Sequence, residues 1–144
     1  WRMDNQKNYI KLNKLVDKLK NSEDPKRKYE YILWLGKKLE EPDSNILIPE
    51  NKVNGCVSEV FVKASIHGGK LYWQGYSDAL ITKGLLAFLI NGLNELTPKE
   101  VVKINKKFLE ETGLKASLTP SRSNGFLNIL LKMQSQANEF LSVQ

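Results

Sequence analysis

Residues 57–76 read VSEVFVKASIHGGKLYWQGY, and this stretch decides the fold class. Apolar and polar side chains alternate along residues 57–66, which predicts a half-buried strand. The glycine pair at 68–69 can adopt the positive φ angles that a tight hairpin turn requires, so residues 70–75 return as a second strand. We therefore expect a β-hairpin over 57–76, with the run 51–53 as a third strand at its edge.

Helical periodicity precedes this hairpin. Apolar residues spaced by three and four along residues 8–20 predict an amphipathic helix; they are Leu12, Leu15, Val16 and Leu19. Asp24 followed by Pro25 is an N-cap with proline at the first helical position, which predicts a second helix that ends near residue 40. The two helices should form a helical hairpin over 8–40, followed by a surface loop over 41–55.

Helical signals also follow the hairpin, over residues 79–140. Asp78 is placed to cap the first of these helices, and Thr97 opens a capping box with proline at the first helical position. Residues 118–125 predict a turn before the last helix. The order of elements predicts a single α+β domain spanning 1–144, with helices packed on a small three-stranded antiparallel sheet.

The composition is that of a globular chain, with 41% hydrophobic and 26% charged residues. The longest apolar run, residues 85–90, is far shorter than the roughly 18 to 20 residues of a membrane-spanning helix, so we expect no membrane partner. The net charge is +6, and all but three of the 22 basic residues are lysine. A solvated lysine surface, a polyanion-binding face and a basic surface that helps an acidic partner dock all fit this charge.

One cysteine, Cys56, and one histidine, His67, limit the chemistry of the chain. These counts exclude an intramolecular disulfide, a zinc site of four Cys or His ligands, and an iron–sulfur cluster held by several thiolates of one chain. Gly55 can bend the backbone so that Cys56 stands at the tip of a turn. The alternative is a structural thiol that fills apolar space. His67 lies at the far end of the predicted strand, too distant for a Cys–His hydrolytic pair.

Three segments and the predicted helical hairpin carry a family resemblance. The segments are 53–60 (VNGCVSEV), 77–85 (SDALITKGL) and 118–125 (LTPSRSNG), and the hairpin contains YEYILWLGKKL at 29–39. In order and spacing they resemble the SufE family of sulfur-acceptor proteins, over nearly the whole chain. Val57, which stands where a polar residue is frequent in the family, and the lysine-rich surface depart from the family's commoner pattern.

The resemblance implies a sulfur-transfer function. Proteins of this family accept persulfide sulfur from a pyridoxal-phosphate-dependent cysteine desulfurase of the SufS type, stimulate that enzyme, and deliver sulfur to a SufBCD-type scaffold for iron–sulfur cluster assembly. Cys56 matches the acceptor position. The resemblance further implies partner contacts by Asp78, Arg122, Ser77 and Lys83, and a loop shaped by Gly55 and Ser58. The chain would then be an accessory carrier and not an enzyme, without a metal or cofactor of its own, since pyridoxal phosphate belongs to the desulfurase.

The sequence also allows an alternative function and indicates a cellular location. The alternative is a small basic nucleic-acid- or protein-binding module with a structural cysteine. No aromatic-rich nucleic-acid motif accompanies the lysines, so we expect no nucleic-acid partner. The chain begins at Trp1 and not at methionine, which predicts that a targeting segment has been removed. The family resemblance implies plastids or the bacterial cytoplasm, and a removed targeting segment favours the stroma of a plastid or apicoplast, with the bacterial cytoplasm as the alternative location.

Overall fold

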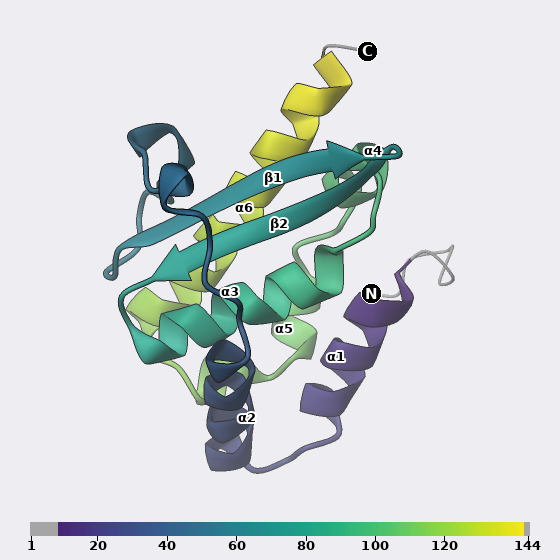
Figure 1. Cartoon of the computed structure of the whole chain (residues 1–144). Helices are drawn as coiled ribbons and strands as arrows, with labels where there is room; N and C mark the ends of the chain where they lie inside the picture. Colours follow the sequence, from purple (N-terminus) through teal and green to yellow (C-terminus); the bar gives the residue numbers. More distant parts are fainter. Residues whose placement is uncertain (1–8, 143–144) are drawn as a thin grey trace.

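An antiparallel β-hairpin runs across the molecule, as Figure 1 shows. The computed structural model describes residues 9–142. β1 (Val60–His67) pairs with β2 (Lys70–Ser77) in an unbroken antiparallel register. Gly68 and Gly69 form the turn with φ angles of 60° and 79°, which glycine adopts without steric cost. The predicted hairpin is confirmed, with β1 beginning at Val60 instead of residue 57.

The sheet has two strands in the described part of the chain, so the predicted third strand over 51–53 is wrong. Pro49–Asn51 is instead a short 3-10 helix, η2, and Lys52 forms only an isolated bridge to β1. The cause is local, because the side-chain amide of Asn51 donates to the carbonyl oxygen of Ile46 at 3.0 Å and holds the chain in a turn. A strand would need this backbone to be extended.

Helices before and after the hairpin complete an α+β fold, which confirms the expected class (Figure 1). α3 contacts β2 on one side and the α1–α2 pair on the other, while α6 packs along β1. The helical elements are α1 (Ile10–Lys20), α2 (Pro25–Lys37), η1 (Ser44–Ile46), α3 (Leu80–Leu93), α4 (Pro98–Val102), α5 (Phe108–Glu111), η3 (Leu114–Ala116) and α6 (Pro120–Ser142).

α3 is the buried centre of the helical part. It approaches α2 most closely at two glycines: a Cβ on Gly36 would stand 2.8 Å from the backbone nitrogen of Gly84, and a Cβ on Gly84 would overlap the carbonyl oxygen of Ile32. On its other side, the ring of Phe88 packs edge-on against Phe126 of α6, with centroids 5.8 Å apart. These contacts fix the starts of α3 and α6 relative to each other, which matters for the site described below.

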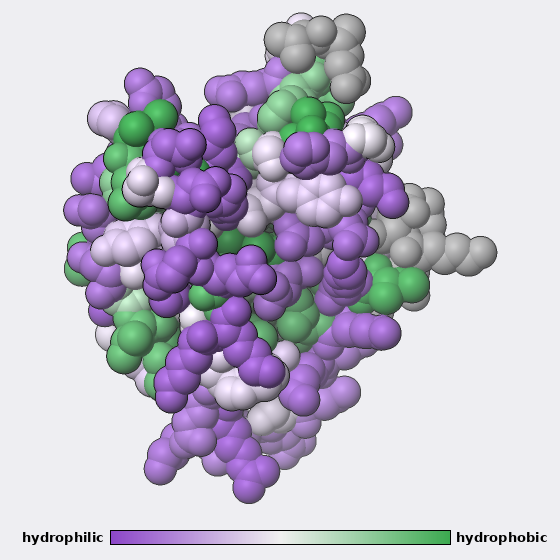
Figure 2. Space-filling model, viewed as in Figure 1, coloured by the Kyte–Doolittle hydropathy of each residue, from purple (hydrophilic) through white to green (hydrophobic). Residues whose placement is uncertain are grey.

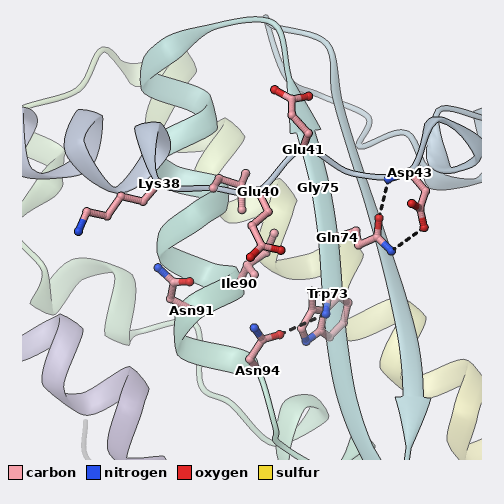
Figure 3. Close-up of a pocket in the computed structure, with 11 residues that line it drawn as sticks. Lys38, Glu40, Glu41, Asp43, Trp73, Gln74, Gly75, Ile90, Asn91 and Asn94 are labelled. Carbon is pink, nitrogen blue, oxygen red and sulfur yellow. Dashed lines mark hydrogen bonds between the residues drawn. The ribbon is translucent and has the colours of Figure 1, made fainter.

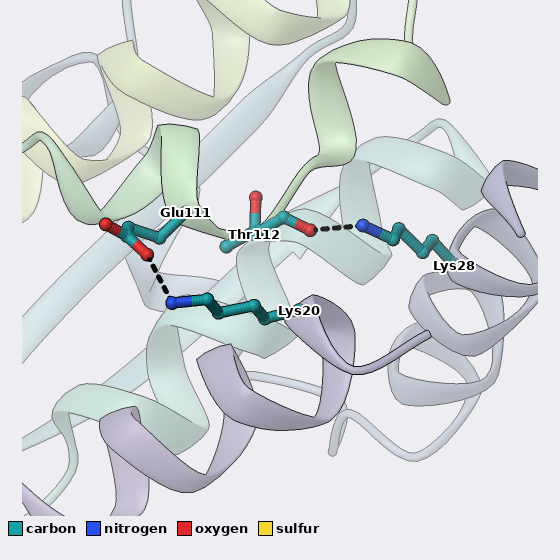
Figure 4. A network of polar contacts seen from close by, with 4 residues as sticks. All are labelled: Lys20, Lys28, Glu111 and Thr112. Atoms are coloured by element: carbon teal, nitrogen blue, oxygen red, sulfur yellow. Dashed lines mark hydrogen bonds and ion pairs between the residues drawn. The ribbon is translucent and has the colours of Figure 1, made fainter. Parts of the chain in front are cut away.

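Two lysines fasten the α1–α2 pair to the end of α5, as Figure 4 shows. Nζ of Lys28 donates to the carbonyl oxygen of Thr112 at 3.0 Å, and Nζ of Lys20 lies 3.0 Å from a carboxylate oxygen of Glu111. Lys28 is only 9% exposed, and its ammonium group gives a partner to a carbonyl oxygen that the helix end leaves without one. Part of the lysine excess therefore serves the fold and does not form a binding surface.

Two of the predicted helix starts are confirmed. The carboxylate of Asp24 accepts from the backbone N–H of Lys26 at 3.0 Å. Thr97 and Glu100 exchange the two hydrogen bonds of a capping box, at 2.9 and 3.2 Å. The expectation for Asp78 is wrong: α3 begins after Ala79 without a side-chain cap, because the carboxylate of Asp78 is bonded elsewhere, as described below.

The turn predicted over 118–125 is also wrong, because α6 already begins at Pro120. Thr119 and Pro120 repeat the cap-proline pattern that starts α2, and the hydroxyl of Thr119 accepts from the backbone N–H of Arg122 at 3.3 Å. The turn-favouring residues that follow are thus the first turns of a helix. Arg122 and Gly125 consequently stand on a rigid element and not in a flexible connection.

The outer edge of β1 is covered by a side chain of α6. The amide of Gln136 accepts from the N–H of Ala64 at 2.9 Å and donates to the carbonyl oxygen of Val62 at 2.7 Å, in the manner of a neighbouring strand. An exposed edge of this kind invites pairing with another chain. These two hydrogen bonds also fix β1, and with it the loop that precedes it, against α6.

The outer edge of β2 is covered in a similar way, as Figure 3 shows. The side-chain oxygen of Asn94 accepts from the N–H of Trp73 at 3.1 Å. Gln74 accepts from the backbone N–H of Asp43 at 2.7 Å and donates to its carboxylate at 3.3 Å. A cavity of about 480 Å³ opens beside these residues, between β2, α3 and the segment after α2, and it shares no lining residue with the loop that carries Cys56.

Candidate functional site

Cys56 lies in a short loop whose two ends are fastened together. The backbone N–H of Val53 donates to the carbonyl oxygen of Val60 at 2.9 Å, which closes the loop at its base. Gly55 has a φ angle of 81°, in the left-handed region that favours glycine. The bend expected before Cys56 is therefore present. We call residues 54–58 the cysteine loop.

The thiol of Cys56 faces the first turns of α6. Its Sγ atom lies 3.7 Å from the carbonyl oxygen of Gly125, and a Cβ on that glycine would meet the sulfur at 3.5 Å, an ordinary van der Waals distance. Cys56 is half-buried, and burial raises the pKa of its thiol above the ordinary value because water solvates the thiolate less well there. The loop as observed thus holds a protonated, shielded thiol at neutral pH.

Three side chains on three segments form a hydrogen-bonded chain beside Cys56. Arg122 of α6 donates through Nη1 to the hydroxyl of Thr82 at 3.1 Å, and that hydroxyl lies 3.3 Å from the hydroxyl of Ser58. Arg122 and Ser58, both expected to belong to the site, are therefore brought together. Thr82 was missed, although it lies inside the segment 77–85 that carried part of the resemblance.

Asp78 fastens the end of the cysteine loop. Its carboxylate accepts from the backbone N–H of Glu59 at 3.0 Å, and its own N–H donates to the carbonyl oxygen of Glu59 at 3.3 Å. Asp78 remains exposed to solvent. The other two expected contact residues lie nearby in the chain: the buried hydroxyl of Ser77 accepts from the N–H of Ala79 at 3.3 Å, and Lys83 is half-buried on the first turn of α3.

Asn128 is a further residue of the site that the sequence analysis missed. Its side-chain amide donates to the carbonyl oxygen of Gly55 at 3.0 Å and packs against the α-carbon side of that glycine. The sequence analysis overlooked Asn128 because it expected a turn over 118–125 and not a helix that begins at Pro120. Once α6 begins at Pro120, Asn128 lies three residues after Gly125 and on the same helix face, directed at the cysteine loop.

Two large apolar side chains near Cys56 are open to solvent. Val57, in the cysteine loop, is 74% exposed, and Leu80, the first residue of α3, is 71% exposed. In Figure 1 the loop before β1, the start of α3 and the start of α6 gather at one edge of the molecule, and Figure 2 shows apolar side chains along that edge of a mostly hydrophilic face. These two side chains give the edge that carries Cys56 an apolar component.

The described residues offer little support for other kinds of site. Within residues 9–142, no group of three or more His, Cys, Asp and Glu is arranged to hold a metal ion. No helix in the same range is both long and apolar enough to cross a membrane. His67 ends β1 at the hairpin turn, opposite the end that follows Cys56, so the expected separation of the two residues is confirmed.

The loop, the two helix starts and the lone thiol define a small α+β domain with a single cysteine at one edge. A family model described as "SufE: Fe-S metabolism associated domain" matches residues 13–137. The chain therefore belongs to the SufE family, and the resemblance found in the sequence is confirmed. The family's description connects this domain with iron–sulfur metabolism.

Similar proteins come from cyanobacteria, plants and parasites. The chain is 51% identical over 129 residues to an uncharacterised SufE-like protein of Synechocystis, covering 90% of this chain and 81% of that protein. It is 41% identical over 128 residues to the chloroplastic/mitochondrial SufE-like protein 1 of Arabidopsis thaliana, and 34% identical over 115 residues to the cysteine desulfuration protein SufE of Plasmodium falciparum. These matches cover 88% and 76% of this chain, but only 34% and 46% of those two proteins.

A solved structure supports the same fold. The solution structure of a hypothetical protein from Thermus thermophilus matches with a TM-score of 0.79 at 25% identity, covering 92% of this chain and 96% of that one. The arrangement of hairpin and helices is therefore shared with that protein. The α+β architecture thus rests on both the family model and a solved structure.

Proposed function

We propose that this chain accepts persulfide sulfur on Cys56 from a pyridoxal-phosphate-dependent cysteine desulfurase of the SufS type, stimulates that enzyme, and delivers the sulfur to a SufBCD-type scaffold for iron–sulfur cluster assembly. The observation that carries the proposal is the position of Cys56, the single cysteine, in a bent loop with a closed base, on a domain of the SufE family. The name of the Plasmodium falciparum relative, a cysteine desulfuration protein, supports it.

The transfer step needs no thiol beyond Cys56 and the desulfurase cysteine. The Cys56 thiolate attacks the outer sulfur of the desulfurase cysteine persulfide, a new S–S bond forms to Cys56, and the S–S bond of the donor breaks. The desulfurase cysteine leaves as a thiolate, and Cys56 carries the persulfide. The number of S–S bonds is unchanged, so neither an oxidant nor a reductant is consumed, as in thiol–disulfide exchange. The chain acts as a carrier, and the pyridoxal phosphate belongs to the desulfurase.

The observed loop explains both protection and the need for a partner. Burial against α6 keeps Cys56 protonated and shielded, which slows the oxidation of a thiol or persulfide. The same half-burial limits the approach of another protein to the sulfur. Sulfur transfer therefore requires the cysteine loop to move away from α6, so that the thiolate becomes solvated or meets a cation of the desulfurase.

The docking surface of the proposal surrounds the loop. The exposed side chains of Val57 and Leu80 supply apolar contact, and the exposed carboxylate of Asp78 and the guanidinium of Arg122 supply charges of opposite sign. Thr82 takes one N–H of Arg122, and the remaining donors of the planar fork suit a carboxylate of the partner. Lys83 completes the contact set, whereas the expected contact by Ser77 is disfavoured, because its side chain is buried and its hydroxyl accepts from the N–H of Ala79. Because the thiol and these groups lie at one edge, one partner can contact all of them.

We place this activity in a plastid-type compartment, on the strength of the chloroplastic/mitochondrial and Plasmodium relatives. Imaging the tagged product of the whole gene in its own cell tests the location. Mixing the chain with its organism's SufS-type desulfurase, cysteine and a reductant tests the function. The wild-type chain should increase sulfide release severalfold, and Cys56→Ser should not. Equal stimulation by Cys56→Ser would refute sulfur acceptance.

A basic nucleic-acid-binding module would instead bind an oligonucleotide with salt-sensitive affinity, whether or not Cys56 is present.

A further inference from the structure

One face of α6 contacts the chain around Cys56 at every turn. Gly125, Asn128, Lys132 and Gln136 follow one another at spacings of three and four, so they share a helix face. Gly125 meets the thiol of Cys56, Asn128 bonds to Gly55, Lys132 donates to the carbonyl oxygen of Glu50 at 2.8 Å, and Gln136 holds the edge of β1. The face therefore holds both the cysteine loop and the segments on either side of it.

The flanking contacts confine any movement to the cysteine loop itself. Before the loop, Lys132 holds Glu50. At the base, Val53 is bonded to Val60 at 2.9 Å, and Glu59 is bonded to Asp78. Residues 54–58 can therefore leave α6 without disturbing β1 or η2.

The contacts within the loop differ in strength. On the side of Ser58, the hydroxyl–hydroxyl contact with Thr82 is 3.3 Å long. At Cys56, the sulfur lies 3.7 Å from its acceptor, and a thiol is a weak donor. The bond from Asn128 to Gly55 is the shortest of the three, at 3.0 Å, with an amide donor and a carbonyl acceptor. It acts on the residue directly before Cys56.

We propose that Asn128 is a positioning residue that holds the cysteine loop closed and so sets how much of the protein presents Cys56 to a partner. Its role in sulfur transfer rests on the proposed function, whereas its control of thiol access does not. Removing the Asn128 bond should raise the open fraction about fivefold, the change that corresponds to a net hydrogen bond of about 1 kcal/mol. A partner that binds only the open loop would gain the same factor in apparent affinity.

The first test measures alkylation of Cys56 by iodoacetamide, followed by the mass of the intact chain, without any desulfurase. Asn128→Ala should react about fivefold faster than the wild type. Asn128→Asp should also react faster, because a carboxylate accepts but cannot donate to the Gly55 carbonyl. Lys132→Ala is the matched control, since it removes a bond from the same helix face that lies outside the cysteine loop. It should react at the wild-type rate.

Two outcomes overturn the proposal. One is wild-type alkylation rates in both Asn128 variants with unchanged thermal unfolding. The other is equal acceleration in Lys132→Ala, which would indicate general loosening of α6. If Asn128→Ala does not fold, the alkylation rate of Asn128→Asp, compared with those of the wild type and Lys132→Ala, tests the proposal alone. If both fail to fold, Asn128 is required by the fold itself, and its assignment to loop control is rejected.

A second readout separates positioning from mere structural support. In the desulfurase assay, Asn128→Ala should lower the concentration of chain needed for half-maximal stimulation about fivefold and leave the maximal rate unchanged. A fall in the maximal rate would contradict this. If Cys56→Ser stimulates fully while alkylation still follows Asn128, the proposed function fails and the role of Asn128 in thiol access stands.

Discussion

Nη1 of Arg122 donates to the hydroxyl of Thr82 at 3.1 Å, and through that hydroxyl the start of α6 is connected to the start of α3 and to Ser58 of the cysteine loop. The two residues are 40 positions apart in the sequence. Their contact orients the guanidinium toward the edge of the molecule at which Cys56 lies. One hydroxyl thus positions both a loop residue and a charged group for partner contact.

Replacing this hydroxyl should cost stability. Thr82→Val keeps the side-chain shape but leaves an N–H of Arg122 and the hydroxyl of Ser58 without this partner. We expect the free energy of unfolding to fall by about 1 to 2 kcal/mol, measured by urea denaturation. Ser121→Ala, which changes an exposed hydroxyl on the same turn of α6, should stay within about 0.5 kcal/mol of the wild type. A wild-type urea midpoint in Thr82→Val would show that the contact is not formed in solution.

Arg122→Lys tests the proposed partner contact. Lysine keeps the charge but lacks the planar fork that pairs with a carboxylate through two hydrogen bonds. The concentration of chain that half-saturates desulfurase stimulation should rise by about tenfold, equivalent to about 1.4 kcal/mol. Arg27→Lys makes the same chemical change at an exposed site on α2 and should have no effect. Equal half-saturation in both variants argues against a role for Arg122 in docking.

The sequence predicted best where a local chemical rule decides the structure. Gly68 and Gly69 make the hairpin turn, and Asp24 caps α2, because these positions depend only on neighbouring residues. It predicted the site in part. Cys56 was singled out by its place after Gly55 and Arg122 by the resemblance, whereas Thr82 and Asn128 contact partners 24 and 73 residues away. Such contacts follow from the packing of distant segments, so no pattern in the neighbouring sequence predicts them.

The failures have a physical cause of the same kind. The turn expected over 118–125 is helical because Thr119 caps the helix and Phe126 packs against Phe88, which outweighs the low helix propensity of the serines, Asn124 and Gly125. The carboxylate of Asp78 bonds to Glu59 across the loop instead of capping α3. In both places a bond that the sequence analysis did not expect decided the structure: a local cap at Thr119, and a contact across the loop at Asp78.

The approach of α2 to α3 gives a prediction for the fold. Gly84→Ala places a Cβ against the carbonyl oxygen of Ile32, a backbone atom that cannot move alone. We expect a loss of about 2 to 3 kcal/mol in the free energy of unfolding. Gly92→Ala in the same helix is the matched control, because its Cβ meets the end of the flexible Leu12 side chain at 2.8 Å. It should cost less than half as much, and equal losses would contradict the backbone contact.

The protonation of Cys56 gives a prediction for pH. Burial raises the pKa of its thiol, so the folded protein holds this proton more tightly than the unfolded chain does. The associated stability is complete below the thiol's unfolded pKa and is lost as pH rises through its folded pKa. Alkylation followed against pH should show a midpoint above the ordinary thiol value in the folded protein and at that value in guanidinium. A folded midpoint at or below the unfolded one would contradict the observed burial.

Sulfur acceptance by Cys56 can be read from the mass of the intact chain. The chain is incubated with its SufS-type desulfurase and cysteine in the absence of reductant and is then separated from the enzyme. Its intact mass is measured by mass spectrometry. We predict a gain in mass of one sulfur atom on the wild-type chain. This gain should disappear on adding a reductant and should be absent in Cys56→Ser. An unchanged mass of the wild-type chain, under conditions in which the desulfurase itself carries a persulfide, would contradict the account.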